Sequence, residues 1–198
     1  MGKIYVVIGK SASGKDTIFK YLREDETLQM KTVVGYTTRP IRDGERDGVE
    51  YFFVSDEQFE QLKADGKIIE YRTYHTIHGP WNYFTVSDGQ IDLTKEDYLF
   101  INTLEAYNQI RKYFGEDKVI PIYIEVEDGE RLTRAINREK QQSEPKYAEL
   151  CRRFLADSED FSEEKLRESG IERRFYNDDM KECMKEIIEF IHNDQKAK

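Results

Sequence analysis

The chain is poor in cysteine, has no long apolar run and carries no excess of basic residues. Its two cysteines, Cys151 and Cys183, have neither metal-ligand nor redox-type spacing, which excludes a disulfide framework or a zinc ribbon. Neither a bilayer-spanning stretch nor an N-terminal signal is recognisable, so we expect a cytoplasmic protein with no membrane partner. The formal net charge of −9 argues against nucleic acid as a partner.

The most informative segment is IYVVIGKSASGKDT, residues 4–17. A short apolar run leads into the GxxxxGK spacing of a P-loop, in which glycines at positive φ let backbone N–H groups converge on a phosphate. A helix that begins near the second glycine points its positive dipole end at the same anion. The lysine adds a full positive charge, so we predict catalytic and ATP-binding roles for it. The predicted ATP-binding residues of this segment are Gly9, Ser11, Ala12, Ser13, Gly14, Lys15, Asp16 and Thr17.

One position departs from the P-loop pattern. After Lys15 the motif expects Ser or Thr, whose hydroxyl binds Mg²⁺, but this chain has Asp16 followed by Thr17. A carboxylate is also a hard oxygen ligand, so we predict Asp16 as a magnesium ligand. Two alternatives stay open: Thr17 supplies the ligand, or Asp16 only favours the helix N-terminus.

Apolar strand-like segments alternate with helical ones along the 198 residues. This alternation predicts a single α/β domain with a three-layer P-loop fold, a parallel central sheet, an inserted acceptor-binding lobe and a helical lid. We assign the core to about 1–33, 91–128 and 171–198, the strand-rich lobe to about 34–90, and the polar lid to about 129–170. A β-rich segment is expected at 31–38. The final helix is expected over 180–192, followed by a frayed tail.

A second constellation lies within residues 37–59. Arg39 and Arg42 are joined through the stiff Pro40, so both guanidinium groups can bind one phosphate, and the Tyr51 hydroxyl can complete the site. The alternative is a solvated basic turn balanced by its acidic neighbours.

This segment resembles the acceptor-binding region of guanylate kinases, whose pattern is TTR-x-x-R-x-GE-x-x-G-x-x-Y-x-F. The matching residues stand in register with it: Thr37, Thr38, Arg39, Arg42, Gly44, Glu45, Gly48, Tyr51 and Phe53. The resemblance continues along essentially the whole chain. It implies a guanine-reading glutamate at Glu70, an ATP-site asparagine at Asn177, and three catalytic lid arginines at Arg134, Arg138 and Arg153.

The chemistry of these positions agrees with the implied roles. Guanine offers two adjacent donors, N1–H and the 2-amino group, and a carboxylate such as that of Glu70 can accept from both. Arg134 and Arg138 share a helix face, where positive charge stabilises a phosphoryl group in transfer. Taken alone, Glu70 could instead be a solvated strand end, and the arginines a salt-bridged surface helix.

The departures from the family cluster on the acceptor side. The family has a serine where this chain has Gly35, and an acidic residue where it has Phe100. In the family's GNYYGT segment we align His78 with a phosphate-binding tyrosine and Pro80 with a base-reading Ser or Thr. Asn102 remains a candidate base contact, and the lid is four residues longer between its second and third arginines.

The resemblance therefore implies ATP-dependent phosphorylation of a nucleoside monophosphate, most directly GMP to GDP, with Mg²⁺ and by direct in-line transfer. The predicted acceptor-binding residues are Arg39, Arg42, Tyr51, Glu70, His78 and Asn102. Two alternatives stay open: a P-loop kinase for a different phosphorylated acceptor, and a catalytically silent binding module. The oligomeric state, monomer or dimer, is not predicted.

Overall fold

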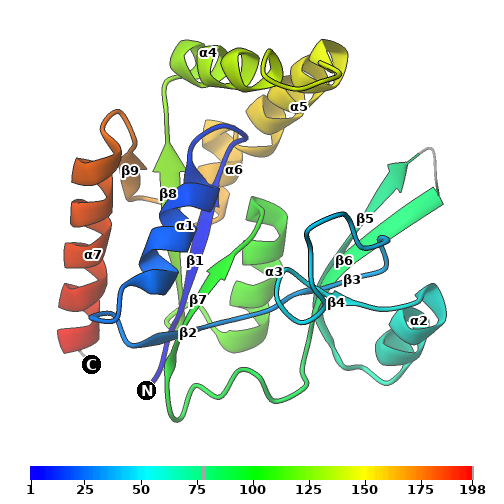
Figure 1. Ribbon diagram of the computed structural model, residues 1–198. Helices are drawn as coiled ribbons and strands as arrows, with labels where there is room; N and C mark the ends of the chain where they lie inside the picture. The colour runs from blue at the N-terminus through cyan, green and yellow to red at the C-terminus, as the bar shows by residue number, and fades with distance from the viewer. Residues whose placement is uncertain (77–78, 198) are drawn as a thin grey trace.

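The central sheet is fully parallel and sits in the middle of the molecule (Figure 1). The computed structural model describes residues 1–76 and 79–197. The sheet order is β2-β7-β1-β8-β9, formed by Met30–Thr32, Asp97–Ile101, Ile4–Gly9, Val119–Glu125 and Arg174–Tyr176. Strands β2 and β7 lie on one side of β1, and the later strands β8 and β9 lie on the other side. Open α/β sheets bind ligands at the carboxyl ends of the strands where the strand order changes side in this way.

Helices cover both faces of this sheet, because alternate residues of β1 point to opposite sides. Ile4, Val6 and Ile8 belong to the core cluster that includes residues of α3, Leu104–Phe114, and α6, Glu163–Glu168. Tyr5 and Val7 belong to the opposite cluster, with residues of α1, Lys15–Glu24, and α7, Met180–Lys196. The predicted three-layer α/β architecture is confirmed, and burial on both faces explains why the strands read as continuous apolar runs.

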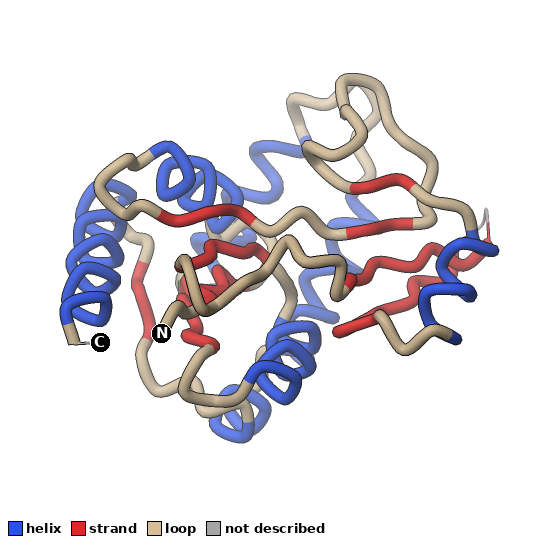
Figure 2. Tube along the Cα trace, turned by 90° about the horizontal axis from the view of Figure 1, so that it is seen from below, coloured by secondary structure: helices blue, strands red, loops and turns tan. Residues whose placement is uncertain are grey.

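A second sheet lies to one side of the first (Figure 2). Its order is β4-β3-β6-β5, formed by Phe52–Phe53, Tyr36–Thr37, Gly79–Val86 and Ile68–Thr76. Helix α2, Asp56–Ala64, packs on it through Phe59, which contacts the ring of Phe84. A capping box between Ser55 and Gln58 fixes the start of this helix.

The polar segment forms two helices above the carboxyl ends of the central strands (Figure 1). These are α4, Asp128–Glu139, and α5, Tyr147–Asp160. Arg131 of α4 joins them: its guanidinium pairs with Asp157 at 3.1 Å and stacks 4.1 Å above the Phe154 ring. The two helices therefore pack as one unit over the phosphate loop.

The β-rich segment expected at 31–38 contains two strands that join different sheets: β2 belongs to the central sheet and β3 to the second one. The expected frayed tail is wrong, because α7 continues to Lys196. Asp194 accepts hydrogen bonds from Lys3 Nζ and Tyr5 Oη, both at 2.6 Å, and these tertiary contacts hold the last turns of the helix.

Candidate active site

The phosphate loop connects β1 to α1 and needs its two glycines. Gly14 has φ 86°, and even Ala12 adopts a left-handed φ of 62°. A Cβ at Gly9 would lie 2.7 Å from the Ile124 carbonyl oxygen, and one at Gly14 would lie 2.5 Å from Asn177 Nδ2. Side chains at these glycines would therefore displace the loop from the residues around it.

The Asn177 side chain holds the phosphate loop in place by a hydrogen bond. Its Nδ2 donates to the Ser13 carbonyl at 2.8 Å, and its own carbonyl accepts from Arg134 Nη2 at 3.0 Å. Both Asn177 and Ser13 are fully buried. The predicted ATP-site asparagine thus lies beside the phosphate loop and joins the loop to the first lid arginine.

A lid carboxylate already binds one backbone amide of the loop. Asp157 Oδ2 accepts from the Ser11 N–H at 2.8 Å, and Arg131 Nη1 donates to both Asp157 and the Ser11 carbonyl. The carboxylate oxygen stands in for an anionic oxygen at an N–H group of the kind that cradles phosphate. Asp157 could not be singled out from the sequence, because a single acidic residue on a polar helix has no distinctive spacing.

Lys15 and Asp16 follow at the start of α1. Lys15 Nζ lies 3.3 Å from Asp16 Oδ2, while the Asp16 side chain is 83% exposed. Thr17 is also exposed, and Phe100 is buried with no oxygen to offer. Asp16 thus presents an accessible carboxylate oxygen beside Lys15, which fits the chemistry that Mg²⁺ requires. Within the described residues no cluster of three or more His, Cys, Asp or Glu is arranged to bind a metal by itself.

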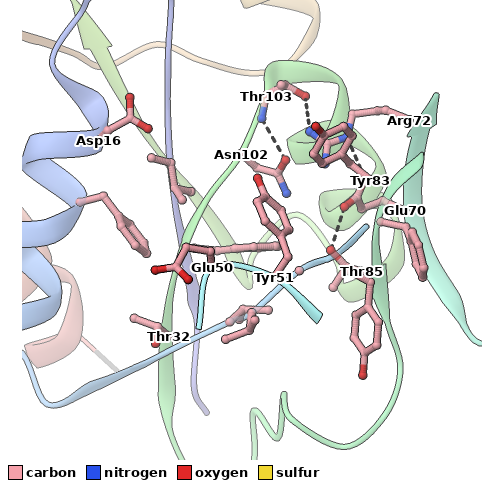
Figure 3. A pocket seen from close by; sticks show the side chains of 18 of the residues that line it. Asp16, Thr32, Glu50, Tyr51, Glu70, Arg72, Tyr83, Thr85, Asn102 and Thr103 are labelled. Atoms are coloured by element: carbon pink, nitrogen blue, oxygen red, sulfur yellow. Dashed lines mark hydrogen bonds and ion pairs between the residues drawn. The ribbon is translucent and has the colours of Figure 1, made fainter. Parts of the chain in front are cut away.

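A cavity of about 660 Å³ opens between α1, the second sheet and the end of β7 (Figure 3). Lys15, Asp16, Tyr51, Glu70 and Asn102 all line it, so the structure brings together predicted residues from four separate segments. Its walls mix aromatic and aliphatic side chains with polar ones. Glu70, Arg72, Thr85 and Asn102 lie together at the end formed by β5, β6 and the segment after β7, which we call the polar end, while Lys15, Asp16 and Arg23 line the cavity from α1. We call this hollow the acceptor cavity.

Glu70 is fully buried at the polar end of the acceptor cavity. Thr85 Oγ1 donates to its Oε1 at 2.7 Å, and Arg72 Nε lies 3.3 Å from its Oε2. Burial raises the pKa of the Glu70 carboxyl, and the nearby Arg72, Thr85 and Asn102 oppose that rise. The solvated-strand-end interpretation of Glu70 is therefore wrong: the side chain faces the cavity, where burial makes an unpaired carboxylate costly.

Two residues of the β5–β6 hairpin, Tyr83 and Thr85, lie at the acceptor cavity although they were not predicted as site residues. Glu70 pairs with Thr85 across the hairpin, and both Thr85 and Tyr83 line the acceptor cavity. Pro80 pairs with His75 further along the hairpin, and His78 lies outside the described residues. Tyr83 and Thr85 are two residues apart, the same spacing as the tyrosine and the Ser or Thr of the GNYYGT segment, and this spacing was the missed signal.

The basic residues of the 37–59 segment are held by neighbours. Arg39 is buried, makes a bidentate pair with Glu45 at 2.8 Å and donates from Nε to the Tyr83 hydroxyl at 3.2 Å. Its guanidinium also lies 5.5 Å from the centre of the Tyr51 ring. Arg42 is exposed, and its backbone N–H donates to Glu45. Arg39, Tyr51 and Tyr83 thus form one cluster, while the Arg42 side chain projects to the surface.

The three lid arginines occupy different surroundings. Arg134 pairs with Glu130 at 2.9 Å and bonds to the Asn177 carbonyl. Arg153 lines a second cavity, of about 630 Å³, between the phosphate loop and α5. Arg138 is exposed and lies with Arg153 at a smaller hollow on the lid.

The acceptor cavity and this second cavity meet at shared residues. Lys15, Tyr74, Asn102 and Thr103 line both of them. Gly9 and Ser11 of the phosphate loop line the second cavity, and Glu70 lines the acceptor cavity. Lys15 therefore stands between a space bounded by the phosphate loop and the acceptor cavity, which has Glu70 at its polar end.

No described helix is both long and apolar enough to cross a membrane.

Comparisons with known proteins agree with this geometry. The guanylate kinase family model matches residues 1–194. The guanylate kinase of Vibrio parahaemolyticus is 34% identical over 79% of this chain and 72% of its own length, and that of Fusobacterium nucleatum is 26% identical over 98% and 97%. The Oceanobacillus iheyensis guanylate kinase is 42% identical, but its alignment spans only 45% of either protein.

The fold agrees as well. The crystal structure of guanylate kinase from Anaplasma phagocytophilum superposes with a TM-score of 0.69 at 21% identity, covering 98% of this chain and 86% of that one. At that identity the superposition establishes the P-loop fold alone. Because the family model spans nearly the whole chain and a relative above 30% identity covers most of it, the chain belongs to the guanylate kinase family.

Proposed function

We propose that this protein is a nucleoside monophosphate kinase that transfers the γ-phosphoryl group of ATP to GMP, giving ADP and GDP. The observation that carries the proposal is the position of Lys15, which lines both the cavity at the phosphate loop and the acceptor cavity. Direct in-line transfer requires donor and acceptor phosphates to meet at one positively charged point. The membership of the chain in the guanylate kinase family supports the same reaction.

On the donor side, the backbone amides of residues 11–17 and the Lys15 ammonium would bind the ATP phosphates. Arg134, Arg138 and Arg153 would supply further positive charge, and Arg153 already lines the second cavity, between the phosphate loop and α5. Lid closure would bring Arg138 inward from the surface and exclude water, which limits wasteful hydrolysis of ATP. Asn177 would keep the phosphate loop in its binding shape.

On the acceptor side, Glu70 would accept from guanine N1–H and the 2-amino group, with Thr85 fixing the carboxylate. Asn102 lies at the same polar end. Arg39, Arg42, Tyr51 and Tyr83 would hold the GMP phosphate, although Arg39 must then share its guanidinium between that phosphate and Glu45. The chemistry needs no strong base, because the acceptor phosphate is itself the nucleophile.

Asp16 would hold Mg²⁺ on the donor phosphates, which places the supporting carboxylate at the start of α1. The ion would neutralise charge on the transferred group and orient it. Because Phe100 has no oxygen, the strand β7 offers no second carboxylate at that position.

The catalytically silent binding module is not favoured, because the chain keeps the phosphate-loop geometry and Lys15. The test is GMP-dependent formation of ADP by the intact chain and by Lys15→Met, with ATP-induced thermal stabilisation measured on both. We expect turnover in the wild type only, with kcat reduced at least about 1,000-fold in the variant. A wild-type protein that ATP stabilises but that phosphorylates no nucleoside monophosphate would contradict the proposal.

A further inference from the structure

A buried donor and a buried acceptor face the polar end of the acceptor cavity without hydrogen-bond partners. Glu70 Oε2 and Arg72 Nε form an ion pair at 3.3 Å, yet neither atom makes a hydrogen bond within the described part of the chain. Their side chains are 0% and 10% exposed, and both line the cavity. Since nearly all buried polar atoms in native proteins are paired, these two atoms point to a ligand that pairs with both.

The rest of each side chain is held in place. Arg72 Nη1 donates to Thr103 Oγ1 at 3.0 Å, and the same hydroxyl caps α3 by accepting from the Ala106 N–H at 3.3 Å. Glu70 Oε1 is held by Thr85 at the opposite end of the pair. Figure 3 shows Arg72 and Glu70 side by side between these two anchors. One donor and one acceptor are thus left in fixed positions, which is how a site selects a hydrogen-bonding edge.

The Arg72 Nε–H donor next to the Glu70 Oε2 acceptor is complementary to the edge of a base that presents a hydrogen-bond acceptor next to a donor. We infer that Arg72 is a specificity-determining residue that donates from Nε to O6 of the acceptor guanine while Glu70 accepts from N1–H, an inference that rests on the proposed function. In the same pose adenine would turn its 6-amino group toward the guanidinium, so two donors would face each other.

A purely structural role is the competing explanation, since Arg72 could do no more than orient Glu70. The two roles differ in which atom of the substrate they sense. 6-Thio-GMP keeps N1–H, the 2-amino group and the phosphate, and replaces only O6 with sulfur, a weak acceptor. An arginine that binds O6 discriminates against this analogue, whereas an arginine that only orients Glu70 does not.

The experiment measures kcat/KM for GMP and 6-thio-GMP with the wild type, Arg72→Met and Arg72→Gln. We expect the wild type to prefer GMP by about 10- to 100-fold, the range for a hydrogen bond to a charged group. Arg72→Met should lose most of this preference, and Arg72→Gln, which keeps an amide donor, should retain part of it. Lys67→Met, an exposed residue of the same lobe that does not line the cavity, is the matched control and should keep the wild-type ratio.

Equal loss of activity toward both substrates, with the wild-type ratio preserved in Arg72→Met, would overturn the inference. Thermal unfolding and the KM for ATP show whether each variant folds. If the wild type phosphorylated UMP and no guanine nucleotide, the proposed function alone would fail. Uracil presents the same pair through O4 and N3–H, so UMP and 4-thio-UMP would then replace the two substrates. A wild type that preferred AMP would overturn the inference together with the proposed function.

Discussion

Under the proposed function, Glu70 is the side chain on which acceptor selection would depend most. It is fully buried at the end of the acceptor cavity, where Thr85 donates to its Oε1 and its Oε2 lies 3.3 Å from Arg72 Nε. Glu70→Gln keeps the shape but replaces one acceptor oxygen with a donor group. We expect kcat/KM for GMP to fall about 100-fold, roughly 3 kcal/mol, while the KM for ATP stays unchanged. Steady-state kinetics with each substrate varied in turn would measure both, and an unchanged GMP efficiency would exclude Glu70 as the base reader.

The same burial predicts a pH dependence. Because burial raises the pKa of Glu70, the carboxyl takes up a proton at a higher pH than an exposed glutamate does. Protonation turns one acceptor into a donor, so the KM for GMP should rise as the pH falls through this raised pKa. The KM for ATP should not follow the same curve. The measurement is a pH profile of both constants, and a GMP profile that Glu70→Gln leaves unchanged would refute the assignment.

Asp16 carries the magnesium hypothesis. Its carboxylate is exposed and lies 3.3 Å from Lys15 Nζ. Asp16→Asn keeps an oxygen but removes the charge, so we expect the Mg²⁺ concentration needed for half-maximal activity to rise about tenfold. Titration of activity with Mg²⁺ at fixed ATP would measure this. Full activity of Asp16→Ser at low Mg²⁺ would count against a metal role for this carboxylate.

Among single residues, the sequence predicted those of the phosphate loop and the start of β5 better than those further along the β5–β6 hairpin. Lys15 and Glu70 line the cavities because the phosphate loop and the buried start of β5 have little local freedom. Tyr83 and Thr85 were missed because strand pairing decides which residue faces Glu70, and pairing depends on the length of the turn. Arg72 was missed because an arginine two residues after Glu70 has no distinctive spacing, and Thr103, which accepts from its Nη1, is distant in sequence.

At the scale of elements, the lid helix α5 is joined to the phosphate loop by Asp157. This carboxylate occupies the Ser11 N–H and would repel a bound triphosphate at the same place. Removing it with Asp157→Ala should therefore lower the Kd for ATP by about three- to tenfold. Isothermal titration without acceptor would measure the Kd.

The matched control is Asp160→Ala. Asp160 lies on α5 and lines the second cavity, as Asp157 does, but its carboxylate pairs with Lys165. This change should leave the Kd for ATP close to that of the wild type. Weaker ATP binding in Asp157→Ala than in Asp160→Ala would mean that Asp157 supports the binding shape of the loop rather than opposing the nucleotide.

Helix limits followed from local signals wherever those signals were present. Ser55 caps α2 and Thr103 caps α3, as residues of these types do at helix starts. The end of α7 was mispredicted, because its residues are polar and their tertiary hydrogen bonds cannot be read from the sequence. Asp194 accepts from Lys3 and Tyr5, and Gln195 donates to the Leu28 carbonyl. Local polarity suggests fraying, and only the folded chain supplies those partners.

For the whole molecule, the two cavities beside Lys15 imply that lobe and lid close on their nucleotides. The cavities measure about 660 and 630 Å³, and Arg138 remains at the surface. A non-hydrolysable ATP analogue and GMP together should reduce the radius of gyration toward about 16 Å, the value expected for a compact chain of this length. Small-angle X-ray scattering would detect the change, and an identical radius with and without both ligands would argue against closure.

The central claim is that this fold joins a triphosphate site to a guanine-selective acceptor site. Its most direct test is kcat/KM for nucleoside diphosphate formation from ATP–Mg²⁺ with GMP, dGMP, IMP, AMP, CMP and UMP offered separately. We predict efficient turnover of GMP and dGMP, weaker turnover of IMP because it lacks the 2-amino group, and at least about 1,000-fold lower values for the other three. Comparable efficiency with AMP, or no turnover of GMP by a protein that binds ATP, would contradict the claim.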